Sequence, residues 1–139
     1  MEFRRVLFRS HAACSVGIIG FQVALAMGAP LGRYAMGGVY PGVLPPSMRV
    51  AEAVQAVVIA TLACIVLALS GVTLHRWRAG ARRVRWVPLV VATLALVLNL
   101  ITPSREERLV WAPVALVLFL SSLTVGLLAS PRERPRSAA

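Results

Sequence analysis

Four polar side chains lie within stretches of sequence that are otherwise apolar, and they are the candidates for chemistry in this chain. They are Glu52, Gln55, Asn99 and Gln22. Glu52 and Gln55 are three residues apart, so on a helix they share a face. A carboxylate at the centre of a bilayer costs on the order of 3 kcal/mol, which marks such a residue as a candidate functional site. The four could line a cavity open to the outside, where Glu52 would bind a ligand or accept a proton.

The same residues also have a structural interpretation. Glu52 is expected about two residues inside a helix, where the macrodipole favours an anion, and Arg49 stands three residues before it, within reach of an ion pair. Gln22 is expected roughly at mid-depth in its helix. The three amides could hydrogen-bond across helices as packing contacts. The sequence leaves both interpretations open.

The segment "TPSREERLVW" holds two adjacent glutamates between arginines. Ser104 and Glu107 have the spacing of a capping box, with Pro103 just outside it, so they predict a helix start. Adjacent glutamates cannot point the same way on a helix, which argues against a paired-carboxylate site. We expect structural roles for Ser104 and Glu107, and a helix kink at Pro113.

No catalytic or cofactor motif accompanies these residues. Cys14 and Cys64 form no Cys-x-x-Cys motif. The sequence also lacks a catalytic triad, a glycine-rich phosphate loop and a His-x-x-x-His pattern. We therefore expect no enzyme activity, no cofactor and no metal site.

The composition indicates the solvent in which these residues act. Of the 139 residues, 58% are hydrophobic and 14% are charged, against about a quarter charged in soluble domains. This predicts an integral membrane protein. The net charge of +10 comes from arginines in short clusters between apolar runs, so we expect no nucleic-acid partner. Fifteen arginines and no lysine suggest a GC-rich bacterial gene, and hence the bacterial inner membrane.

A transmembrane helix needs about 20 mostly apolar residues, and four stretches approach that length. We expect an all-α fold, a four-helix transmembrane bundle over residues 11–130, with spans at about 12–31, 50–72, 86–101 and 109–129. The third span is short and is expected to borrow length from Val84 while Arg85 snorkels to the headgroups. Ser47 is expected to cap the second helix.

Arginines predict the orientation of the spans. The segment "TLHRWRAGARRVR" between spans two and three carries five arginines, and the tail over residues 131–139, expected to be disordered, carries three more. Both should be cytoplasmic by the positive-inside rule, and an even number of spans places them on one side. We therefore expect both termini inside. Trp86 and Trp111 fall at opposite membrane boundaries, where aromatic belts lie.

The connection from Gly32 to Met48, "GRYAMGGVYPGVLPPSM", is too broken for a helix and too apolar for a free loop. We expect it to lie at the outer interface or to fold over the bundle as a lid, with Tyr34 and Tyr40 at headgroup depth.

Small residues at spacing four predict close contacts between spans. These are Gly20, Ala24, Gly28, Gly32, Ala56, Ala60, Cys64, Ala68, Ser122, Gly126 and Ser130.

At "FQVALAMGAPLGRYAMGGVYPGVLPPSMRVAEAV" and "NLITPSREERLVWAPVALVL" the chain resembles a family of small four-span integral membrane proteins of GC-rich bacteria that carry no assigned activity. The resemblance covers most of residues 16–130. It implies four helices and supplies no active site. The small multidrug exporters share size and span number, but their essential glutamate lies in the first span, where this chain has Gln22.

The first ten residues, "MEFRRVLFRS", do not read as a targeting segment. Their apolar part is too short for a signal peptide, and no small-residue cleavage site follows. The codons CTG GAG TTC AGA CGT GTG CTC TTC CGA TCT encode these residues if CTG is taken as a start, and they resemble the tail of a common sequencing-library adapter. We expect that residues 1–10 are not part of the natural protein, which would begin somewhere before His11.

Two classes of function remain. The first, which the sequence favours, is a non-enzymatic membrane bundle that packs in the lipid bilayer with itself or with a partner. The second is a small transporter or apolar-ligand binder with an outward-facing polar cavity at Glu52, Gln55 and Asn99. A filled bundle in which Glu52 pairs with Arg49 would favour the first class. A continuous polar cavity touching the three residues would favour the second.

Overall fold

A computed structural model of the chain describes residues 2–71 and 74–128, and all regular structure in this part is helical. The fold class predicted from the sequence, all-α, is confirmed there. Short 3-10 turns lie between several of the helices. The five α-helices are α1 (Glu2–Ala26), α2 (Pro46–Ser70), α3 (Arg78–Arg83), α4 (Val87–Ile101) and α5 (Arg105–Leu128).

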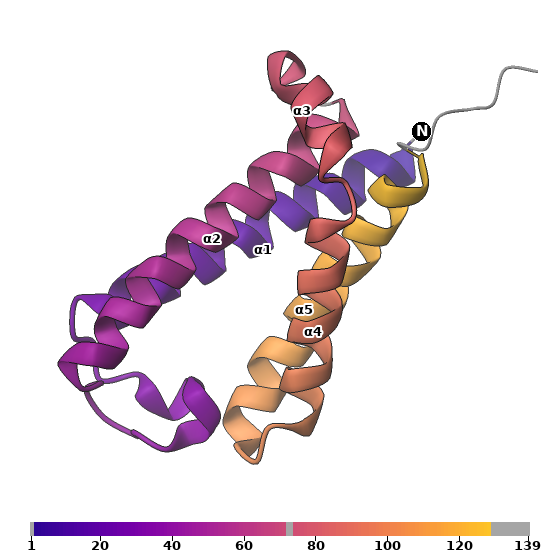
Figure 1. Ribbon diagram of the computed structural model, residues 1–139. Coiled ribbons are helices and arrows are strands. Elements are labelled where there is room, and N and C mark those ends of the chain that lie inside the picture. The colour runs from indigo at the N-terminus through magenta and orange to yellow at the C-terminus, as the bar shows by residue number, and fades with distance from the viewer. Residues whose placement is uncertain (1, 72–73, 129–139) are drawn as a thin grey trace, which may run out of the picture.

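The long helices form two pairs. α1 packs most extensively on α2, and α4 on α5, while α1 also contacts α5. In Figure 1 the pairs diverge from the end where α1 begins and α5 ends, the end that also holds α3. We call this the arginine end. Residues 27–45, which we call the lid, join α1 to α2 at the opposite end and reach across to the start of α5 (Figure 1). This opposite end is the lid end.

Three helices are long and apolar enough to cross a membrane: α1 over Arg5–Ala26, α2 and α5. α4 has 15 residues, a rise of roughly 22 Å, whereas a hydrocarbon core is about 30 Å thick. With the helical segment before it, α4 forms a pair that is bent by 72°. Residues 2–71 and 74–128 therefore hold three candidate spans, or four if this bent pair counts as one.

The helix of the third predicted span does not continue through Val84. Val84 has non-helical dihedral angles, φ −108° and ψ 20°, and ends α3 instead of beginning α4. The helix starts after Trp86, with Pro88 in its first turn, where the missing N–H costs nothing. The Arg85 guanidinium lies 5.3 Å from the centre of the Trp86 ring, a cation–π contact.

Other helix boundaries also differ from those predicted, and α1 begins at Glu2, ten residues before the predicted span. α1 ends at Ala26 and not near residue 31, because Gly28 adopts a positive φ of 97°. α2 begins at Pro46, four residues before the predicted span, because proline suits a first helical turn. No side-chain hydrogen bond caps α2, so the prediction for Ser47 is wrong.

The fourth predicted span corresponds to α5. This helix begins at Arg105 and runs as one helix across Pro113. The last residue of the second predicted span, Val72, and the last of the fourth, Ala129, lie outside the described residues, as does the predicted tail over 131–139.

Most of the buried apolar residues form one cluster at each end. Near the lid end, Leu25 of α1 packs against Ala35 and Leu44 of the lid. At the arginine end the cluster joins α1, α2, α3 and α5; it consists of Phe8, Val66, Ala68, Leu69, Ala81 and Val125. Phe8 lies in the segment whose origin the sequence puts in question, and its burial does not test that prediction.

Some of the small residues predicted at helix contacts are buried and others are not. Ala56 and Ala68 of α2 and Ser122 of α5 are buried. Gly126 contacts the Trp86 indole so closely that an added Cβ would lie 2.8 Å from Cζ3. Gly20 is exposed, and no atom would lie within 4 Å of an added Cβ, so the predicted contact there is wrong.

Candidate ligand-binding site

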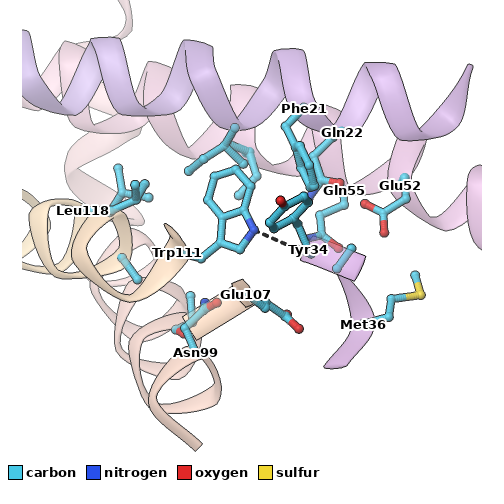
Figure 2. Close-up of a pocket in the computed structure, with 16 residues that line it drawn as sticks. Phe21, Gln22, Tyr34, Met36, Glu52, Gln55, Asn99, Glu107, Trp111 and Leu118 are labelled. Atoms are coloured by element: carbon cyan, nitrogen blue, oxygen red, sulfur yellow. Dashed lines mark hydrogen bonds between the residues drawn. The ribbon is translucent and has the colours of Figure 1, made fainter. Parts of the chain in front are cut away.

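The four polar residues singled out by the sequence line a single cavity of about 290 Å³ (Figure 2). Sixteen residues line it, and they come from α1, α2, α4, α5 and the lid. Figure 2 shows Glu52 and Gln55 on one side of the cavity and Glu107 and Asn99 on the other. The structure thus brings together residues that are up to 100 positions apart, as Ile18 and Leu118 are (118 − 18 = 100).

Glu52 is the most deeply buried acidic side chain of the cavity. It is 2% exposed, and its Oε2 atom has no hydrogen-bond partner. Because α2 starts at Pro46, Glu52 is in the second turn of the helix and not in the first, where the macrodipole acts most strongly. A macrodipole therefore offers little compensation for burying this carboxyl group.

The ion pair between Glu52 and Arg49 that the spacing predicts is not formed. The Arg49 Nε–H donates to the carbonyl oxygen of Ala26 at 2.8 Å, which ties the start of α2 to the end of α1. Arg49 therefore has a structural role, but its partner is a backbone carbonyl. The carboxyl group of Glu52 remains available to the cavity.

Gln22 is a second buried polar group without a partner. Its side chain is 5% exposed, and its Oε1 atom has no hydrogen-bond partner. Since α1 ends at Ala26, Gln22 lies one turn from the end of the helix and not at mid-depth as expected. A buried acceptor without a donor costs about 1–3 kcal/mol. The cavity holds two such acceptors, and a bound molecule that supplied donors or positive charge would remove this cost.

Gln55 and Asn99 complete the predicted polar set. Gln55 is exposed while Glu52 is buried, so the cavity reaches from the surface into the interior along α2. Asn99 is half-buried, and its Nδ2–H donates to the carbonyl oxygen of Ala95 at 2.8 Å. This bond lies within α4. The packing contact between helices that was an alternative for Asn99 is thus not made by its amide nitrogen.

Glu107 also lines the cavity, although the sequence pointed only to a helix cap. Ser104 Oγ accepts a hydrogen bond from the Glu107 backbone N–H at 3.2 Å, as an N-cap residue does. The reciprocal half of the capping box is not made. Instead, Glu107 Oε2 accepts the backbone N–H of Gly37 at 2.7 Å and the hydroxyl of Thr102 at 3.1 Å. Its carboxylate therefore holds the lid while facing the cavity.

The lid is attached to the start of α5 by two further hydrogen bonds. Trp111 Nε1–H donates to the carbonyl oxygen of Tyr34 at 2.7 Å (Figure 2), and Ser104 Oγ–H donates to that of Arg33 at 3.2 Å. Within the lid, Gly32 N–H donates to the carbonyl oxygen of Gly42 at 3.0 Å. The segment thus lies over the bundle and closes one wall of the cavity.

Three aromatic residues of the cavity were not among the candidates from the sequence. Phe21 and Trp111 have ring centroids 4.7 Å apart with an interplanar angle of 57°, and Tyr34 lies next to them on the lid. Trp111 follows Glu107 by one helical turn, a spacing that could have revealed it. Nothing in the sequence distinguishes Phe21 from other apolar residues of α1.

Comparisons with protein-family models, with curated proteins and with solved structures found no match to this chain. The chemistry of the site therefore rests on its own residues. The cavity offers two carboxyl groups, three amides and three aromatic rings, and its remaining lining is mostly apolar. This combination can hold a small molecule with both polar and apolar parts.

Proposed function

We propose that this chain is a small bacterial inner-membrane protein that binds a small organic molecule in the cavity beneath the lid. The observation that carries the proposal is the continuous cavity touching Glu52, Gln55 and Asn99, together with the absence of an ion pair from Glu52. In a bundle that only packs with itself or with a partner, two buried acceptors without hydrogen-bond donors would lower stability and serve no purpose in packing. The proposed activity is binding without catalysis.

We also propose four spans with both termini in the cytoplasm. The support is that the five arginines before α4 lie at the end of the molecule where α1 begins and α5 ends (Figure 1). α4 would be the short span, and its mismatch with the bilayer would be met by local thinning or by its flanking residues. In this orientation the lid faces away from the cytoplasm.

Transport is the second candidate, and it would use the same site. It would also need a path from the cavity to the arginine end, where Val66 is 1% exposed and Val125 is 3% exposed within a packed cluster. The lid closes the cavity on one side, away from the arginine end. We therefore favour a binder over a transporter.

The experiment uses Trp111 as a reporter. Of the three tryptophans, Trp77 and Trp86 do not line the cavity, so the Trp77→Phe/Trp86→Phe protein reports on Trp111 alone. The purified protein in detergent micelles is titrated with phenyltrimethylammonium, tert-butylbenzene and benzoate. We expect saturable changes in Trp111 fluorescence with at least one of these probes.

Two substitutions on α4 separate cavity binding from general partitioning. Ala95→Phe fills the cavity and should abolish the saturable change, whereas Val97→Phe, at an exposed position that does not line the cavity, should leave it intact. The proposal fails if no probe gives a saturable change. It also fails if Ala95→Phe and Val97→Phe bind the probes alike.

A further inference from the structure

We infer that the cavity recognises a small organic cation, either a quaternary ammonium or a protonated amine. This inference rests on the proposed function and names the class of ligand. It is drawn from the charges, unpartnered acceptors and aromatic rings that surround the cavity.

The charges that line the cavity are of one sign. Glu52 and Glu107 are acidic, and none of the other described lining residues is basic. The two arginines nearest in sequence to these glutamates are engaged with backbone oxygens: Arg49 with Ala26 at 2.8 Å, and Arg108 Nη2 with Thr102 at 2.6 Å. A cavity with carboxylates and apolar walls concentrates cations and repels anions.

The unpartnered polar atoms of the cavity are acceptors. Glu52 is 98% buried (100 − 2), Gln22 is 95% buried (100 − 5), and an oxygen of each has no donor. Glu107 already accepts two hydrogen bonds from the protein, so its remaining contribution to the cavity is mainly its charge. Glu52 and Gln22 are therefore the groups that would meet the N–H or the polarised C–H groups of a cationic ligand.

The aromatic rings favour an organic cation over a metal ion. Phe21, Tyr34 and Trp111 line the same cavity as Glu52, and quaternary ammonium groups bind aromatic rings through cation–π attraction. A bare metal ion would instead need several oxygen ligands around one point. The volume of about 290 Å³ is at the small end for ligand pockets, so the cation should be small.

The test compares two probes of the same shape. Phenyltrimethylammonium and tert-butylbenzene differ in having a charged nitrogen or a neutral carbon at the centre of the head. In the Trp77→Phe/Trp86→Phe protein, we expect the cation to bind at least about tenfold more tightly than the neutral probe, because a carboxylate a few ångströms away attracts it. Benzoate should bind more weakly than either.

Glu52→Gln keeps the shape of the side chain and removes its charge, so it should reduce the preference for the cation by about tenfold and leave the affinity for tert-butylbenzene unchanged. Glu106→Gln is the matched control, because Glu106 is exposed and does not line this cavity. It should leave the preference intact. Glu52→Asp, which retains the charge, should restore most of it.

The outcomes distinguish the inference from the proposed function. If tert-butylbenzene binds as tightly as the cation and Ala95→Phe abolishes both, the cavity binds ligands but the inference of a cationic ligand is wrong. If Glu52→Gln and Glu106→Gln reduce the preference equally, Glu52 is not the recognising group. If none of the three probes binds, both proposals fail. If Glu52→Gln does not fold, the relative affinities of the three probes for the protein with Glu52 intact still decide whether the cavity prefers a cation.

Discussion

The lid end and the arginine end hold the same helices together by different means. At the lid end, side chains such as Trp111 and Glu107 hydrogen-bond to the backbone of the lid. At the arginine end, Val66, Leu69 and Val125 pack in an apolar cluster. An apolar cluster also lies near the lid end, around Leu25, and a buried hydrogen bond of 2.6 Å between His11 Nδ1 and Ser121 Oγ joins α1 to α5. The difference is therefore that side-chain hydrogen bonds hold the lid where the helix pairs diverge.

The hollows at the two ends differ in volume and in the polar atoms that they touch. A hollow of about 610 Å³ between α2 and α3 is larger than the cavity at the lid end, which measures about 290 Å³. Yet none of the buried unpartnered polar atoms among the described residues belongs to the larger hollow, whereas two belong to the cavity. Volume alone does not mark a site; unsatisfied buried groups in contact with the volume do.

The largest effect should come from Gly32→Ala. A Cβ there would overlap the carbonyl oxygen of Tyr40, a backbone atom that cannot move aside alone. We expect a loss of about 3 kcal/mol, in the range for overpacked sites. At the arginine end, Gly126→Ala should cost about 1 kcal/mol, because the Trp86 side chain can shift. Denaturant-induced unfolding in micelles measures both.

Gly42→Ala is the control for this pair, because no atom would lie within 4 Å of its added Cβ. It should change the free energy of unfolding by less than about 0.5 kcal/mol. A larger loss for Gly126→Ala than for Gly32→Ala would contradict the close packing of the lid.

The next largest effect comes from comparing a tryptophan-to-phenylalanine substitution at each end. Trp111→Phe removes the hydrogen bond to Tyr34 and leaves its carbonyl oxygen without this donor, which should cost about 1–2 kcal/mol. Trp86→Phe keeps an aromatic ring on Gly126, and we expect a loss below about 1 kcal/mol. Limited proteolysis of the lid should accelerate only in Trp111→Phe. Equal acceleration in both proteins would mean that the bond does not hold the lid.

The smallest effect distinguishes two serines near helix starts. Ser104→Ala should lower the free energy of unfolding by about 1 kcal/mol, because Oγ caps α5. Ser47→Ala should change it by less than about 0.5 kcal/mol, because no side chain caps α2. Thermal unfolding of the two variants in the same micelles compares them. A loss for Ser47→Ala as large as that for Ser104→Ala would show that α2 is capped after all.

The sequence predicted the helical fold and the grouping of Glu52, Gln55, Asn99 and Gln22. Apolar length indicates membrane helices, and isolated polar residues within such helices tend to face each other. The start of α2 was misplaced because the predicted span begins at Val50, whereas the helix begins at Pro46, with Pro45 in the cap position expected for Ser47. Glu52 therefore lies in the second turn, where the helix macrodipole compensates little for the burial of its carboxyl group.

The role of Glu107 was not predictable from local sequence. Its carboxylate accepts the N–H of Gly37, which lies 70 residues earlier, and this contact depends on how the lid folds across the helix pairs. The capping pattern correctly indicated the bond from the Glu107 N–H to Ser104, but the reciprocal bond that it predicts for the Glu107 carboxylate is not made. Local spacing predicts contacts along one helix, whereas contacts between the lid and α5 depend on tertiary structure.

The central claim is that a water-accessible cavity beneath the lid selects cations on the side opposite the arginine end. It is tested by cysteine modification at Gln55, with Val39 in the lid, 67% exposed, as the reference position. Each is changed to cysteine in a Cys14→Ala/Cys64→Ala protein in intact cells. Membrane-impermeant methanethiosulfonates bearing either trimethylammonium or sulfonate are added outside.

We predict that both cysteines react from outside. The ratio of the cationic to the anionic rate should be about tenfold higher at Gln55→Cys than at Val39→Cys, because the carboxylates concentrate cations in the cavity. Equal ratios at the two positions would contradict the claim, as would modification of Gln55→Cys only after the membrane is permeabilised.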